Sequence, residues 1–186
     1  LPLAKKNELR NELKLNKDKI YFLWLSQDRP KKGLFIILKA WKYIIKHNQN
    51  LELLIVGTKS KIEGKNINSV GRVNPKDVHK YYQVSDYYLF PTLWHEGHPL
   101  SLIEALKCGL KCICSDIDPI KETVKNGNLA YLVQYPNSVK SWVKAIEYVL
   151  FNNYNFNKND IDLNQIYDQK QWEKDFFKLI SNPKDI

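Results

Sequence analysis

Residues 85–109 most constrain what this chain can fold into, because they read as a buried strand, a short loop and a helix in succession. Tyr87–Phe90 is a compact apolar run of strand length, of the kind found inside α/β domains. Pro91 ends this strand because proline has no N–H to donate. Pro99 suits the first turn of a helix, where the missing N–H costs nothing. The segment therefore predicts a helix N-terminus beside the carboxyl end of a strand.

A helix N-terminus in that position favours an anion, because its N–H groups are free and its dipole end is positive. Glu96 lies in the loop and Glu104 lies about one turn into the helix, so two carboxylates flank the same point. Carboxylates are unusual beside a phosphate unless they bind something that the phosphate carries, and sugar hydroxyl groups are the obvious candidate. The plain alternative is a surface loop and a solvated helix face, although strand-to-helix turns in such sheets are where ligands bind.

The rest of the chain alternates between apolar runs of strand length and segments of helical periodicity. Strands are expected at 20–25, 51–56, 67–70, 87–90, 110–115 and 129–133, and further helices at 4–15, 33–46, 75–84, 138–151 and 168–180. A loop with a helical turn is expected at 58–66, and loops at 116–122 and 152–159. Because helices or long connections separate the strands, the sequence predicts an α/β fold with a doubly wound, mostly parallel sheet flanked by helices.

The segment after Phe90 resembles the signature of the GT-B retaining glycosyltransferases of family 4, also called glycosyl transferases group 1. Seven residues separate the two acids, and the matching residues are Pro91-Thr92, Glu96-Gly97, Pro99-Leu100, Ile103-Glu104-Ala105-Leu106 and Gly109. In that family the signature lies in the C-terminal, Rossmann-like domain that binds the nucleotide-sugar donor. The resemblance covers nearly all of this chain and implies the same fold and the same ligand class.

The resemblance implies a role for each matching residue. Glu96 approaches the donor sugar and Glu104 holds the ribose, while the amides between them hold the diphosphate. Before the next helix, Arg29 and Lys32 match cations that bind the diphosphate, although the family's glycine before the arginine is missing; the alternative is an exposed basic turn. Glu96, Arg29 and Lys32 are thus the expected catalytic residues. The expected donor-binding residues around the signature are Glu104, Gly97, His98, Leu100 and Ser101.

Two further donor contacts are implied outside the signature. Arg72 and Val73 follow a glycine after which the family packs the nucleotide base against the backbone. Glu122 matches a family glutamate in the loop at 116–122, where Asp118-Pro119 replaces the family's paired glycines.

Composition limits the other functions. The net charge is +9, which favours anionic partners, but no nucleic-acid-binding motif is present. The three cysteines (Cys108, Cys112 and Cys114) do not suggest a disulfide framework, and with His95 and His98 they match no zinc spacing. The sequence therefore predicts no metal, no covalent cofactor, no nucleic-acid partner and a reducing cytoplasm, with peripheral attraction to the inner face of an anionic membrane as a second expectation.

The resemblance to the family 4 glycosyltransferases implies the following organisation and activity. Residues 1–151 form the nucleotide-sugar-binding domain, and residues 152–186 form a loop and helix that pack on it. The N-terminal domain that binds the acceptor glycan or glycolipid lies outside this chain, so the chain alone is expected to bind nucleotide weakly and to be inactive. The complete enzyme would move a sugar from a nucleoside-diphosphate sugar to an acceptor hydroxyl, in cell-envelope polysaccharide or glycolipid synthesis.

Two alternatives from other classes remain open. The first is a non-catalytic GT-B-like module that binds a nucleotide or a protein. The second is a nucleic-acid-binding domain, which predicts steeply salt-dependent binding of oligonucleotides. The sequence names neither the sugar, the base, the acceptor nor the oligomeric state.

Overall fold

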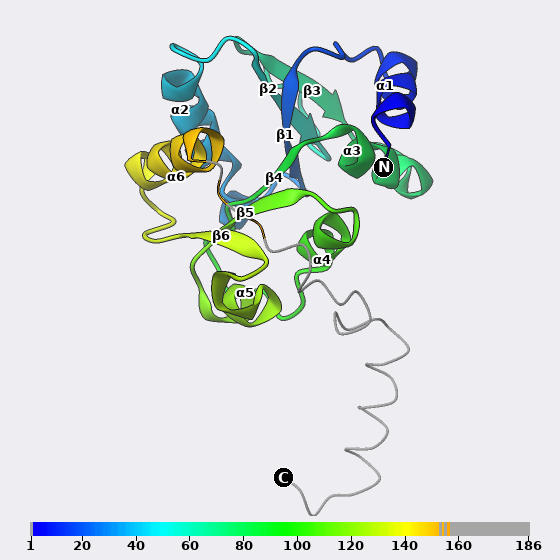
Figure 1. Ribbon diagram of the computed structural model, residues 1–186. Helices are drawn as coiled ribbons and strands as arrows, with labels where there is room; N and C mark the ends of the chain where they lie inside the picture. Colours follow the sequence, from blue (N-terminus) through cyan, green and yellow to red (C-terminus); the bar gives the residue numbers. More distant parts are fainter. Residues whose placement is uncertain (1, 153, 155, 157–186) are drawn as a thin grey trace, which may run out of the picture.

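The computed structural model describes residues 2–152, 154 and 156. Their centre is a six-stranded sheet of order β3-β2-β1-β4-β5-β6, in which every neighbouring pair is parallel (Figure 1). The strand order changes direction between β1 and β4, as in doubly wound folds. The strands are β1 (Ile20–Leu25), β2 (Leu51–Val56), β3 (Ile67–Gly71), β4 (Tyr87–Phe90), β5 (Lys111–Ser115) and β6 (Ala130–Val133).

Helices cover both faces of the sheet, which confirms the expected fold class. α2 (Leu34–Ile44) and α6 (Val139–Phe151) pack together on one face, where Phe22 and Trp24 point. The other face carries Tyr21 and Leu23, because successive strand residues point to opposite sides. The helices on that side are α1 (Leu3–Glu12), α3 (Val78–Val84), α4 (Leu100–Lys107) and α5 (Asp118–Thr123), and the short 3₁₀ turns are η1 (Pro30–Lys32), η2 (Pro75–Asp77) and η3 (Lys125–Gly127).

Two local expectations were wrong. Residues 58–66 contain no helical turn; the Ile62 N–H donates instead to the Ser69 hydroxyl at 3.0 Å, and Asn66 adopts a left-handed φ of 55° that interrupts helical geometry. The segment at 116–122, expected as a loop, contains most of α5. Pro119 lies in the first turn of α5, where proline favours helix initiation. The expected helix at 168–180 and most of the loop at 152–159 lie outside the described residues.

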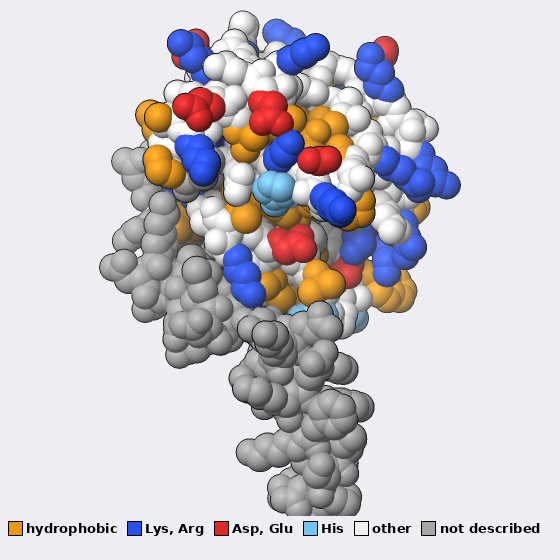
Figure 2. Space-filling view, turned by 90° about the vertical axis from the view of Figure 1, so that its right-hand side faces the viewer, with side chains coloured by type: hydrophobic (Ala, Val, Ile, Leu, Met, Phe, Trp, Pro, Cys, Tyr) orange, Lys and Arg blue, Asp and Glu red, His pale blue; other side chains and the backbone are white. Residues whose placement is uncertain are grey.

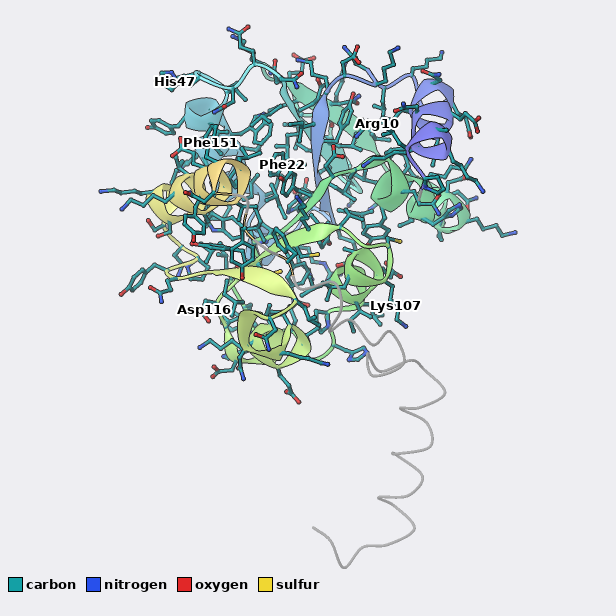
Figure 3. All side chains as sticks on the ribbon, in the orientation of Figure 1. Arg10, Phe22, His47, Lys107, Asp116 and Phe151 are labelled. Atoms are coloured by element: carbon teal, nitrogen blue, oxygen red, sulfur yellow. The ribbon has the colours of Figure 1, made fainter. Side chains whose placement is uncertain are left out.

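Arg10 fixes α1 to the amino-terminal edge of the sheet. Its side chain is only 4% exposed, and its guanidinium lies between α1 and the strands (Figure 3). It donates to Asp86 Oδ2 at 2.8 Å and to the Val84 carbonyl at 2.9 Å. The Tyr21 N–H donates to the same carboxylate oxygen at 2.8 Å. One buried cation therefore ties α1 to the start of both β1 and β4.

The N-cap of α6 provides a test of the fold. Ser138 Oγ accepts a hydrogen bond from the Ser141 N–H at 3.3 Å. We expect Ser138→Ala to lower the free energy of unfolding by about 1 kcal/mol, because the Ser141 N–H then keeps only its second acceptor, the Ser138 carbonyl at 3.1 Å. The measurement is urea unfolding, with Ser60→Ala in an exposed loop as the control. Equal stability of the two variants would mean that the cap contributes nothing.

Candidate functional site

A cleft of about 710 Å³ opens at the carboxyl edge of the sheet. Its lining includes the last residues of three adjacent strands: Leu25 of β1, Val56 of β2 and Phe90 of β4. The cleft therefore lies beside the point where the strand order reverses, which is the usual ligand site of doubly wound sheets.

Most of the sequence-predicted site residues meet in this cleft. They come from three segments that are distant in sequence, namely the turn after β1, the turn after β3, and the loop after β4 with the start of α4. The predicted residues in the lining are Arg29, Lys32, Arg72, Val73, Glu96, His98, Leu100 and Ser101. Gly97, Glu104 and Glu122 are not among the lining residues.

Lys32 and Glu96 form the central polar contact of the cleft. Lys32 Nζ lies 2.7 Å from Glu96 Oε1, and the side chains are only 20% and 13% exposed. The Thr92 hydroxyl, at 3.0 Å, is a second donor to the same oxygen. A partly buried ion pair with a further neutral donor fixes the position of the carboxylate more firmly than an exposed pair would.

The backbone brings these two side chains together through Gly33. Gly33 has a φ of +69°, and a Cβ placed on it would lie 1.9 Å from the Pro91 carbonyl oxygen. The turn after β1 can therefore touch the loop after β4 only because this residue has no side chain. The Leu93 N–H reinforces the contact by donating to the Lys31 carbonyl at 2.8 Å, and Trp24 Nε1 fixes the turn to β1 by donating to the Lys32 carbonyl at 3.2 Å.

The environment of Glu96 keeps its carboxyl group ionised. Burial alone would raise the pKa, but the hydrogen bonds from Lys32 and Thr92 and the charges of Lys32 and Lys31 outweigh burial, so the pKa lies below the ordinary value of 4.5. A carboxylate in this state accepts hydrogen bonds and does not donate them. It suits the recognition of hydroxyl groups.

The lowered pKa predicts a specific pH dependence of stability. Ionised Glu96 contributes stability that is fully present above the unfolded pKa of about 4.5 and is lost as the pH falls through the lower folded pKa. We expect the free energy of unfolding of the unaltered chain to exceed that of Glu96→Gln at pH 7, with the difference shrinking below pH 4.5. Urea titrations of both proteins between pH 7 and pH 3 measure this. A difference that grows toward low pH would contradict it.

The start of α4 offers fewer free N–H groups than the sequence suggested. The Leu100 N–H is bonded to the His98 carbonyl at 2.9 Å, and the Pro99 carbonyl accepts the next two helical N–H groups, at 2.9 and 3.1 Å. Within the described part of the chain, the N–H groups of Gly97, His98 and Ser101 have no acceptor. These three amides, two in the loop and one in the helix, remain available to an anion.

Glu104 lies one turn beyond Ser101 on α4, is exposed and is not part of the cleft lining. Its Oε2 accepts a hydrogen bond from the Tyr82 hydroxyl of α3 at 2.9 Å. Burial is the main cause that raises the pKa of Tyr82, and the neighbouring Tyr88 and Glu104 raise it further. The Tyr82 phenol therefore stays protonated and acts as a donor. The sequence predicts that both acids face one cleft. Glu96 does line the cleft, whereas the carboxylate of Glu104 lies between α3 and α4.

Glu122 is exposed on α5 and lies outside the cleft lining. The cleft also contains residues that sequence reasoning did not single out: Ser26 and Gln27, directly after β1, and Val78 at the start of α3. The position of Ser26 and Gln27 could have indicated them, since residues directly after parallel strands collect at one edge of the sheet. The sequence identifies Thr92 only as part of the signature and does not predict its hydrogen bond to Glu96.

Among the residues that the structure describes, no three His, Cys, Asp or Glu side chains are grouped so that they could hold a metal ion. Cys108, Cys112 and Cys114 are free thiols, and burial raises the pKa of each. Within the same part of the chain, every helix is too short or too polar to cross a membrane.

The fold defines the chain as a Rossmann-like domain with a cleft at the carboxyl edge of its sheet. Comparison with known families identifies it further: residues 5–165 match the family described as glycosyl transferases group 1, and the chain belongs to that family.

Two curated relatives with similar sequences are named as sugar transferases. A UDP-Gal:alpha-D-GlcNAc-diphosphoundecaprenol alpha-1,3-galactosyltransferase of Escherichia coli is 28% identical over 158 residues, which are 78% of this chain and 40% of the relative. A lipopolysaccharide 1,2-N-acetylglucosaminetransferase of Salmonella typhimurium is 24% identical over 162 residues, 77% of this chain and 42% of the relative. The chain therefore spans less than half the length of these relatives.

Solved structures share the fold. A sucrose-phosphate synthase from Thermosynechococcus elongatus superposes with a TM-score of 0.75 at 18% identity, covering 94% of this chain and 49% of that one. The Anabaena protein HepE, solved in complex with UDP and glucose, superposes with a TM-score of 0.77 at 14% identity, covering 97% of this chain and 52% of that one. Both are similar to this chain in fold, and each extends well beyond it.

Proposed function

We propose that this chain is the donor-binding part of a retaining glycosyltransferase that uses a nucleoside-diphosphate sugar. The observation that carries the proposal is that one cleft combines cations, an ionised carboxylate and the amides of His98 and Ser101, which have no acceptor among the residues that the structure describes. Arg29 and Arg72 line the cleft, and within the described residues neither guanidinium has an ion pair. A diphosphate requires the cations and amides, and the attached sugar requires the carboxylate.

In the proposed reaction, the bond between the anomeric carbon and the diphosphate oxygen breaks, and negative charge develops on that leaving oxygen. The oxygen of the acceptor hydroxyl bonds to the anomeric carbon, and its proton leaves with the released nucleoside diphosphate. Arg29, Lys32 and the free amides at Gly97, His98 and Ser101 stabilise that charge. Glu96 holds the sugar through its hydroxyl groups, while Arg72 and Val73 contact the base. Glu104 binds the ribose after turning away from Tyr82. A bound metal is not required, because the cations of the chain neutralise the diphosphate.

The acceptor and the location belong to the same proposal. The two relatives described above are named for undecaprenol-linked and lipopolysaccharide acceptors, and a third, from Mycobacterium leprae, is named a phosphatidyl-myo-inositol mannosyltransferase. By analogy, the acceptor here is a saccharide or glycolipid of the cell envelope, bound by a part of the enzyme outside this chain. The complete enzyme would work in the cytoplasm, peripherally at the inner membrane face, to which the charge of +9 contributes attraction.

The test is turnover by the complete enzyme with a panel of UDP-, GDP- and ADP-sugars and a lipid-linked acceptor extract. We expect one donor class to support transfer and the product to keep the anomeric configuration of the donor, measured by the proton coupling constant of the anomeric position. Inversion of configuration would contradict the retaining mechanism. Failure of every donor to bind would contradict the proposal as a whole.

The position of Glu104 outside the cleft favours one competing function, a non-catalytic module that binds a nucleotide. Such a module would bind UDP or GDP in the cleft, yet the complete protein would release no nucleotide from any donor.

The nucleic-acid alternative has no comparable support. Figure 2 shows basic side chains interspersed with acidic and uncharged ones on the face that it displays, and no continuous basic stripe of the kind that tracks nucleic acid is visible there.

A further inference from the structure

We propose that Thr92 is a positioning residue that holds one oxygen of Glu96 and thereby directs the other oxygen at the sugar of the donor. The inference rests on the proposed function and adds a residue and an atom to it. Thr92 lies two residues after β4, at the start of the loop that carries Glu96, and only 1% of its surface is exposed.

The hydrogen bonds of Glu96 are unevenly divided between its two oxygens. Lys32 Nζ at 2.7 Å and Thr92 Oγ1 at 3.0 Å both donate hydrogen bonds to Oε1. Within the described residues, Oε2 has no hydrogen-bond partner. Because each carboxylate oxygen can accept two hydrogen bonds, the protein occupies one oxygen fully and leaves the other to a ligand. Glu96 lines the cleft, so a ligand hydroxyl is the group that can reach Oε2.

Thr92 is better suited than Lys32 to keep Oε1 in place during binding. Lysine is a flexible point charge, and in the proposed function Lys32 must also serve the diphosphate. Threonine has a short, stiff side chain, and this one is buried at the end of a strand. Thr92 Oγ1 also lies 3.3 Å from the Trp94 carbonyl and 3.4 Å from the Lys31 carbonyl. Its single proton favours Glu96, which is nearer and charged.

The contact predicts a separation between nucleotide binding and sugar binding. A nucleoside diphosphate without sugar leaves Oε2 unused, so its affinity does not depend on how Glu96 is oriented. A nucleoside-diphosphate sugar gains a hydrogen bond to a charged acceptor only while Glu96 is held in position. Loss of Thr92 should therefore reduce the preference for the sugar-carrying ligand and leave the affinity for the nucleotide alone.

The variants are Thr92→Val, which removes the hydroxyl and keeps the shape, and Thr92→Ser, which keeps the hydroxyl. Thr58→Val is the matched control, because Thr58 is fully buried and its hydroxyl has no hydrogen-bond partner in the described part of the chain. In the first experiment, carbon-detected NMR follows the titration of the Glu96 carboxyl group without ligand. We expect Thr92→Val to raise its pKa, whereas Thr92→Ser and Thr58→Val leave it unchanged. An unchanged pKa in Thr92→Val would overturn the inference.

The second experiment measures binding by saturation-transfer NMR, which detects weak complexes. The probes are UDP with UDP-galactose, GDP with GDP-mannose and ADP with ADP-glucose. For the pair that binds, Thr92→Val should keep the affinity for the nucleotide within twofold of that of the unaltered chain and should lower the affinity for the nucleotide-sugar about tenfold. Thr92→Ser should restore the affinity for the nucleotide-sugar. Equal weakening of both ligands would overturn the positioning role. If no probe binds the unaltered chain, the proposed function fails, and with it the ligand side of this inference, whatever the Glu96 titration shows.

Discussion

Replacing Gly33 with alanine should lower the free energy of unfolding by about 3–5 kcal/mol, because two separate costs add. The φ of +69° is unfavourable for a residue with a side chain, and the new Cβ would overlap the Pro91 carbonyl oxygen, at 1.9 Å. That oxygen belongs to backbone at the end of β4, in the core of the sheet, so it cannot move without disturbing β4 and the loop after it. The substitution should also abolish nucleotide binding, since it displaces the turn that brings Arg29 and Lys32 into the cleft.

Gly109 provides the matched control for Gly33. It has a similar φ of +77°, but a Cβ on it would meet no atom within 4 Å. Gly109→Ala should therefore lower the free energy of unfolding by only about 1–2 kcal/mol, the cost of a left-handed φ in a residue with a side chain. Urea unfolding of both variants separates the two costs. Equal destabilisation would show that the close approach to Pro91 is unimportant and would remove the structural reason for a glycine in this turn.

In the complete enzyme, Lys32→Met should lower kcat/KM by about 10²–10³-fold, the effect of removing one group that stabilises charge in a transition state. The substitution removes a cation from the cleft and leaves Glu96 with Thr92 as its remaining donor among the described residues. Methionine keeps the unbranched side chain, so the fold should survive, as circular dichroism can verify.

Lys31→Met is the control for Lys32→Met. Lys31 is the adjacent lysine of the same turn, is exposed and does not line the cleft. We expect its substitution to change kcat/KM by less than about threefold, because Lys31 lies outside the cleft and its charge is the smallest of the named causes that lower the pKa of Glu96. A similar loss in both variants would indicate that only the general positive charge of the turn matters, and the specific role of Lys32 would then be wrong.

The strands and the location of the site could be predicted from the sequence for a simple physical reason. Buried parallel strands are nearly continuous apolar runs, and Ile20–Leu25, Leu51–Val56 and Tyr87–Phe90 are such runs with the same bounds in the structure. The edge at which their carboxyl ends meet is fixed by the parallel arrangement. The residues after β1, β3 and β4 therefore had to converge there.

Side-chain orientation could not be predicted in the same way. Glu104 is bonded to Tyr82, which lies 22 residues earlier on another helix, and this choice depends on how α3 packs beside α4. The bond from Thr92 to Glu96 depends on the path of a short irregular loop, for which periodicity carries no signal. α5 was missed because a helix of six residues is too short to establish an apolar period, although Pro119 marks its start.

The most direct test of the proposed donor site is to follow the backbone amide signals of the ¹⁵N-labelled chain by NMR while UDP, GDP or ADP is added. The amides of Gly97, His98 and Ser101, which have no acceptor among the described residues, should show the largest shifts, together with Arg72 and Val73. Shifts confined to a second cavity, lined by residues such as Asn126 and Tyr131 beside β6, would contradict the account, as would unchanged signals with all three nucleotides.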